Sequence, residues 1–144
     1  MLKASAHSSF LKYKKGTPWL RDRAKYFNTA SKKFIISKKK VEVVTIDSYC
    51  KKNDINFIDI LKIDTEGFDA KVLIGAKNMI LKNKIKLIEI EISLDSEEKQ
   101  AVNNSIYDIE KNLIPFGYKI CAIQTASFNC KFNLGFGLDA IYAC

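Results

Sequence analysis

Residues 57–76 read FIDILKIDTEGFDAKVLIGA, and this stretch decides the fold. Its first part, residues 57–63, is nearly continuous apolar sequence, which predicts a β-strand buried on both faces of a parallel sheet. A short acidic turn follows at residues 64–67 (DTEG), and the apolar spacing after it is typical of an amphipathic helix. In open α/β folds, ligands bind where buried strands end and helices begin. The sequence therefore predicts a candidate site at this turn.

Strand and helix patterns continue on both sides of the turn. Predicted strands cover residues 33–37, 41–46, 57–63, 86–93, 118–124 and 138–143. Predicted helices cover residues 48–52, with Asp47 as N-cap and Tyr49 directed inward, 68–81, and 96–113, which Pro115 and Gly117 end. The alternation predicts a mostly parallel sheet with right-handed crossovers. No helix separates the last two strands, so we expect an antiparallel C-terminal hairpin in an α/β fold.

The charge is unevenly distributed over the 144 residues, a length that suits one domain. The net charge is +8, and residues 1–40 contain 12 lysines and arginines against one acid, Asp22. We therefore expect a basic, irregular N-terminal segment at 1–40 and the folded part at 41–144. Such a segment can contact an anionic partner, or it can be a solvated lysine-rich surface. No RNA-binding motif is visible, so no nucleic-acid partner is expected.

Cysteine spacing and hydropathy bear on two questions: the cellular compartment of the protein and whether it has a zinc site. The four cysteines form no C-x-x-C pair, and His7 is the only histidine, so the sequence predicts reduced thiols and no zinc site. No apolar run approaches the roughly 20 residues of a membrane span, and no signal-peptide pattern opens the chain. These features predict a cytoplasmic protein without a membrane span.

The predicted turn carries two carboxylates, Asp64 and Glu66, which follow Lys62 at the exit from the strand. Side chains alternate along a strand, so the three tend to share one orientation until the strand bends. Gly67 permits a sharp turn into the helix. The alternative interpretation is structural: Asp64 or Thr65 caps the helix, and Glu66 complements its dipole.

A second acidic position strengthens the interpretation as a site. Glu89 and Glu91 lie two residues apart in the strand at 86–93, and Glu91 is near its carboxyl end. If this strand neighbours the one at 57–63, Glu91 lies close to Asp64. Paired carboxylates at strand ends can take a proton, hold a magnesium ion or bind polar groups of a cofactor. We expect Glu89 to be an edge or salt-bridge residue.

The motif resembles the C-terminal part of FkbM-type methyltransferases, whose pattern is K-I-D-x-E-G followed by a helix entering with x-x-V-L-x-G-A. Asp69 stands where that family usually carries a glutamate, and Ile46-Asp47 stands for its Leu-Asp. Residues 7–10 (HSSF) are placed like its short serine-containing segment. The matching residues are Lys62, Ile63, Asp64, Glu66, Gly67, Val72, Leu73, Gly75 and Ala76.

The resemblance implies an S-adenosylmethionine-dependent methyltransferase with a Rossmann-like class I fold. It implies methyl transfer to an oxygen of a sugar or another small molecule. As catalytic residues it implies Asp64, Glu66 and Glu91, with Lys62 supporting them and Gly67 shaping the turn. It assigns no metal to the site.

One part of the family pattern is missing from this sequence. The cofactor loop of the D-x-G-x-x-x-G kind is absent, because the six glycines are at 16, 67, 75, 117, 135 and 137. The cofactor-binding residues therefore stay unassigned, and we expect a partial fold, the C-terminal half of a methyltransferase in an N-terminally truncated chain. The alternative is an inactive remnant or a binding module with a basic arm. A partial sheet exposes an unpaired strand edge, which predicts self-association.

Overall fold

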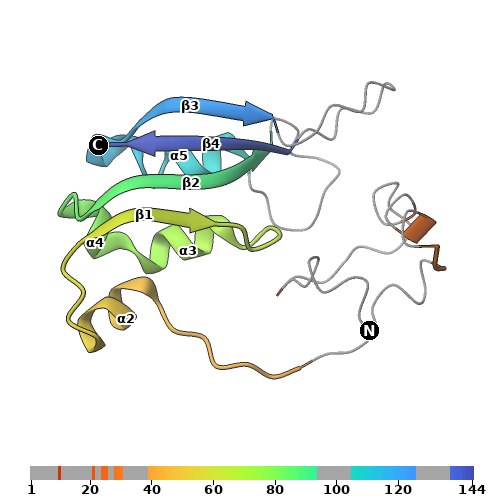
Figure 1. Ribbon diagram of the computed structural model, residues 1–144, viewed down its shortest axis with the longest axis horizontal. Helices are drawn as coiled ribbons and strands as arrows, with labels where there is room; N and C mark the ends of the chain where they lie inside the picture. Colours follow the sequence, from red (N-terminus) through yellow and green to blue (C-terminus); the bar gives the residue numbers. More distant parts are fainter. Residues whose placement is uncertain are drawn as a thin grey trace.

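The computed structural model describes residues 10, 21, 24–25, 28–30, 39–93, 105–125 and 137–144. Within these residues the chain forms an α/β layer structure (Figure 1). The elements are α2 (Ile46–Lys52), β1 (Ile58–Ile63), α3 (Asp69–Gly75), α4 (Lys77–Leu81), β2 (Ile85–Ser93), α5 (Ile106–Glu110), the 3-10 helix η3 (Ile114–Phe116), β3 (Lys119–Thr125) and β4 (Gly137–Ala143). The predicted strand at 33–37 lies outside the described residues.

The four strands form one mixed sheet in the order β1-β2-β4-β3. β1 and β2 are parallel and are joined through α3 and α4, as predicted for a crossover unit. β4 lies between β2 and β3 and is antiparallel to both. The predicted antiparallel pairing of the last two strands is thus confirmed. The expectation of a mostly parallel sheet is wrong, because the insertion of β4 beside β2 leaves a single parallel pair.

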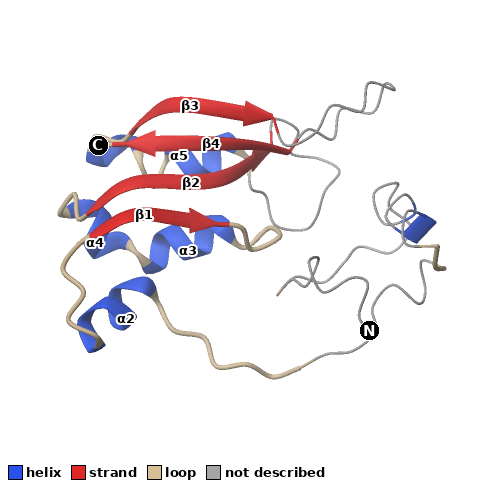
Figure 2. Ribbon diagram, viewed as in Figure 1, coloured by secondary structure: helices blue, strands red, loops and turns tan. Residues whose placement is uncertain are grey.

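One face of this sheet is covered by helices (Figure 2). In β2, Ile88, Ile90 and Ile92 alternate with acidic residues and are almost fully buried, which places their side chains on the covered face. Leu73, Ile80, Ile109 and Leu113 from the helical layer belong to the same apolar core. The core therefore lies between the sheet and helices α3, α4 and α5.

The opposite side of the sheet, which we call the open face, carries no described helix (Figure 2). Its residues follow from the strand register, because paired residues point to the same side: Ile60, Lys62, Leu87, Glu89, Glu91, Asp139 and Ile141. Ile60 of β1 is 63% exposed, whereas Ile63 on the covered side is 2% exposed. The prediction that this strand is buried on both faces is therefore wrong for the described part of the chain.

The predicted strand at 41–46 and the helix after it are also corrected. Residues 41–45 belong to no strand, and Val41, Val43 and Val44 are exposed. Thr45, not Asp47, is the N-cap of α2, and its hydroxyl oxygen accepts a hydrogen bond from the Ser48 N–H at 3.1 Å. β-branched residues favour a strand only when another strand pairs with them, and none does among the described residues. Tyr49, predicted inward, is exposed, and Cys50 is buried instead.

Asp47 caps a different helix. Its carboxylate accepts hydrogen bonds from the backbone N–H groups of Asn78 (2.9 Å) and Met79 (3.1 Å) in the first turn of α4. The predicted single helix at 68–81 is divided at Ala76, whose ψ of 10° is not helical. A Cβ on Gly75 would lie 3.3 Å from the Thr45 Cβ, so glycine permits the close packing of α3 against this capping segment. The break in the helix gives Asp47 access to these N–H groups.

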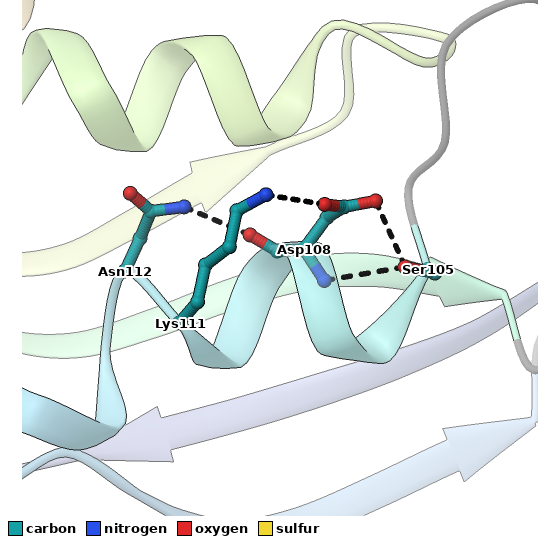
Figure 3. Close-up of polar contacts among 4 residues, drawn as sticks. All are labelled: Ser105, Asp108, Lys111 and Asn112. Carbon is teal, nitrogen blue, oxygen red and sulfur yellow. Dashed lines mark hydrogen bonds and ion pairs between the residues drawn. The ribbon is translucent and has the colours of Figure 1, made fainter.

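The helix α5 begins later than predicted. Ser105 is extended (φ −63°, ψ 147°), and its hydroxyl accepts a hydrogen bond from the Asp108 N–H (Figure 3). The Asp108 carboxylate in turn accepts from Ser105 and Lys111, and these bonds lower the pKa of Asp108, the Lys111 bond most. The helix containing Ile109 therefore starts at Ile106, and residues 96–104 lie outside the described residues.

The described helices are all too short or too polar to cross a membrane. Three cysteines, Cys50, Cys121 and Cys144, are free thiols in the described residues, and Cys130 lies outside them.

Replacing the cap of α4 should destabilise the protein. We expect Asp47→Ala to lower the free energy of unfolding by about 1–2 kcal/mol, the usual cost of losing a helix cap. Asp54→Asn is the matched control, because Asp54 is exposed in a turn with φ of 54°, a conformation that asparagine tolerates. Urea unfolding followed by circular dichroism measures both. An unchanged midpoint for Asp47→Ala would contradict the capping role.

Candidate active site

The parallel register of β1 and β2 determines which acidic residues are neighbours. Lys62 is paired with Glu89 and Ile63 with Ile90, so the next step along both strands places Asp64 beside Glu91. Both positions lie at the carboxyl ends of their strands, and Asp64 is exposed. The predicted proximity of the two strands is confirmed, and it makes these strand ends the candidate active site.

A third acidic residue at this edge was missed by sequence reasoning. Asp139 of β4 is paired with Glu91 across the antiparallel ladder, so both side chains lie on the open face. Directly opposed residues of this kind have Cβ atoms about 4.5–5.5 Å apart. The one sequence signal was a single acid within the apolar strand LDAIYA. Its proximity to Glu91 follows only from the pairing of β4 with β2. The candidate site thus has carboxylates from three successive strands.

Lys62 is the basic residue of this acidic edge. Its ammonium Nζ donates to Glu89 Oε1 at 2.6 Å, which confirms the expectation of a salt bridge for Glu89. This hydrogen bond raises the pKa of Lys62, desolvation opposes the rise, and the charges of Glu89, Asp139 and Asp64 add to it. The side chains of Lys62 and Glu89 are 52% and 34% exposed, so their salt bridge contributes little to stability. Its main effect is to neutralise the charge of Glu89. The charge of Lys62 therefore interacts with acidic residues at β1, β2 and β4.

The turn that follows β1 reverses the backbone within two residues. Glu66 has φ of 52° and Gly67 has φ of 98°, both in the left-handed region. Glycine adopts this conformation readily, whereas a glutamate there is uncommon. Because β1 ends at Ile63, the strand alternation does not extend to Glu66. Gly67 thus has a backbone conformation that suits the predicted turn, and Glu66 lies in the turn instead of continuing the row formed by Lys62.

Asp69 stabilises the turn from the first residue of α3. Its side chain is fully buried (0% exposed), and Oδ1 accepts hydrogen bonds from the Thr65 N–H and the Thr65 hydroxyl, both at 2.8 Å. The N-cap position of α3 is Phe68, without a side-chain capping bond. The structural alternative, in which Asp64 or Thr65 caps this helix, is therefore wrong. Asp69 holds the turn closed and leaves Asp64 exposed at the strand end.

An aromatic contact brings the N-terminal segment to the same turn. The Phe10 and Phe68 ring centroids are 5.2 Å apart with the ring planes tilted by 45°, a favourable geometry for two aromatic rings. Phe10 belongs to the HSSF segment at residues 7–10. At least one residue of the basic N-terminal segment therefore lies against the candidate site.

The described residues offer little for a metal ion or a complete cofactor site. Within them, no three histidine, cysteine or acidic side chains are arranged to hold a metal ion. No described strand pairs with the outer edge of β1, where further sheet and a cofactor loop would have to be attached. The residues present therefore fit only part of a cofactor site.

Comparison with known proteins identifies the family. A family model described as the methyltransferase FkbM domain matches residues 3–120, most of the chain. The chain therefore belongs to the FkbM methyltransferase domain family, as the K-I-D-x-E-G motif indicated. No curated protein and no solved structure shows significant similarity to it.

Two matched substitutions separate the role of Asp69 from that of Asp64. We expect Asp69→Asn to lower the free energy of unfolding by about 1–3 kcal/mol, because a neutral amide oxygen accepts the two buried hydrogen bonds from Thr65 less strongly than a carboxylate does. Asp64→Asn should change it by less than about 0.5 kcal/mol, as is usual for an exposed side chain. Denaturant unfolding measures both, and equal effects would contradict this division of roles.

Proposed function

We propose that this chain forms part of an S-adenosylmethionine-dependent methyltransferase that acts on an oxygen of a sugar or another small molecule. The family match supports methyl transfer in general. The observation that carries the proposal is the β1–β2 register, which places Asp64 beside Glu91 at the carboxyl ends of parallel strands. This is the edge at which α/β folds bind ligands. A Rossmann-like class I fold is part of the proposal.

Each acidic residue has a distinct proposed role. Asp64, exposed at the end of β1, accepts the proton of the acceptor hydroxyl or orients that hydroxyl. Glu91 and Glu66 hold the acceptor in place, and Asp139 joins them from β4. Lys62, bound to Glu89, moderates the mutual repulsion of these carboxylates. S-Adenosylmethionine would supply the methyl group, and alignment of the two substrates would supply most of the acceleration.

The cofactor site must be completed by further structure. The sequence has no D-x-G-x-x-x-G loop, and the outer edge of β1 has no partner among the described strands. We propose that residues 41–144 form the C-terminal half of the methyltransferase domain and that residues 1–40 form a basic segment beside it. The cysteine spacing supports a cytoplasmic location for this domain.

A non-catalytic function is the second candidate. Twelve basic residues against one acid in residues 1–40 favour a binding module whose basic arm contacts an anionic partner. The two candidates differ in a simple observation: methyl transfer after the cofactor half is restored supports the enzyme, and its absence supports the binding module.

The isolated chain should bind S-adenosylmethionine weakly or not at all, because the cofactor loop is missing. Isothermal titration calorimetry of the 144-residue chain with S-adenosylmethionine measures this. Low-micromolar affinity, about −8 kcal/mol of binding free energy, would contradict the proposal of a partial cofactor site.

Within a chain that carries a complete cofactor half, Asp64→Asn should lower turnover at least about tenfold, since general acid–base groups contribute at least this much. Release of S-adenosylhomocysteine in the presence of a panel of sugars gives the rate. Asp54→Asn is the control, because it makes the same chemical change in an exposed turn away from the strand ends. An unchanged rate for Asp64→Asn would reduce that residue to a structural role.

A further inference from the structure

Lys62 has one ion-pair partner among several acidic residues on the open face. Its Nζ donates to Glu89 Oε1 at 2.6 Å across the parallel β1–β2 pair. Glu91 follows Glu89 by two residues on the same face, and Asp139 of β4 is opposite Glu91. Paired residues of adjacent strands are only about 4.8 Å apart, and Glu89 is the residue paired with Lys62. The register therefore determines that the ammonium group binds Glu89.

The charge of Lys62 also reaches Asp64, the proposed catalytic acid. The hydrogen bond to Glu89 raises the pKa of Lys62 most, and the charges of Asp139 and Asp64 raise it further. Asp64 follows Lys62 by two residues, roughly 6.6 Å along an extended strand. Because a lysine side chain is a flexible four-carbon stem, its ammonium group can turn toward either neighbour. Without Glu89, Asp64 and Asp139 would compete for this ammonium group.

We propose that Glu89 is a positioning residue, which holds the Lys62 ammonium group at β2 and so keeps the Asp64 carboxylate available to the acceptor hydroxyl. This inference rests on the proposed role of Asp64 in methyl transfer. An ammonium group bound to Asp64 would occupy the oxygen atoms that have to accept the hydroxyl proton. Glu89 therefore acts on Asp64 through Lys62 and does not itself contact the acceptor.

The exposure of the ion pair separates this role from a contribution to folding. The side chains of Lys62 and Glu89 are 52% and 34% exposed, and exposed ion pairs add little to stability. Glu89→Gln keeps the size of the side chain, so it should release Lys62 and leave the urea unfolding midpoint nearly unchanged. Salt weakens exposed ion pairs, so the effects of this release should diminish as the ionic strength rises. A loss of packing at Glu89 would show no such dependence on salt.

Nuclear magnetic resonance of the isolated chain tests the positioning itself. The side-chain carboxyl carbon of Asp64 is compared between wild type and Glu89→Gln at one pH and low salt. We expect its resonance to shift in Glu89→Gln, and the shift to disappear when Glu89→Gln is made in a Lys62→Met background, which lacks the ammonium group. Glu42→Gln is the matched control, because it makes the same chemical change in an exposed residue outside the sheet. An unshifted Asp64 resonance, or equal shifts with and without Lys62, would overturn the proposal.

Turnover in a chain with a complete cofactor half tests the consequence. Glu89→Gln should lower kcat about two- to fivefold at low salt, the population shift that an exposed ion pair of ordinary strength produces. Glu89→Asp, which restores the charge, should recover most of the rate, and high salt should narrow the difference. In the Lys62→Met background, Glu89→Gln should cause no further loss. An unchanged kcat for Glu89→Gln at low salt, or the same loss in both backgrounds, would overturn the proposal. An inactive wild type would contradict the proposed methyl transfer, and the Asp64 resonance would still decide whether Glu89 positions Lys62.

Discussion

The parallel hydrogen-bonded register of β1 and β2 is the constraint on which the candidate site depends. Because Ile63 is paired with Ile90, Asp64, the residue that follows β1, comes next to Glu91 near the carboxyl end of β2. A shift of one residue would turn the side chains of β1 to the other face, and the buried Ile63 would lose its place in the core. The same burial that stabilises the sheet therefore positions the acidic residues on the open face.

The acidic residues around the motif divide into two groups by their contacts and exposure. Asp69 and Asp47 are architectural: one holds the turn after β1 through Thr65, and the other caps α4. Asp64 is exposed at the end of β1, and the half-buried Glu91 and Asp139 are paired across β2 and β4 on the open face. A carboxylate buried with hydrogen-bond donors fixes geometry, whereas an exposed one is available for chemistry. The proposed mechanism requires that Asp69 fix the turn while Asp64 stays exposed at the end of β1.

The limits of the four strands could be predicted from the sequence alone. β1, β2, β3 and β4 begin and end within a residue or two of their predicted limits, because apolar runs and turn residues mark them. The strand predicted at 41–46 was wrong because pairing is decided by another strand. The division of the helix at Ala76 depends on Asp47, about thirty residues earlier. Asp139 joined the candidate site only through the non-local pairing of β4 with β2.

Nuclear Overhauser contacts between β1 and β2 in the isotope-labelled chain test the central claim most directly. The register predicts methyl contacts between Leu61 and Ile88 and between Ile63 and Ile90, together with backbone contacts between the Asp64 and Glu91 positions. Contacts shifted along either strand, or an antiparallel pattern that places Asp64 at the opposite end of β2 from Glu91, would contradict the account.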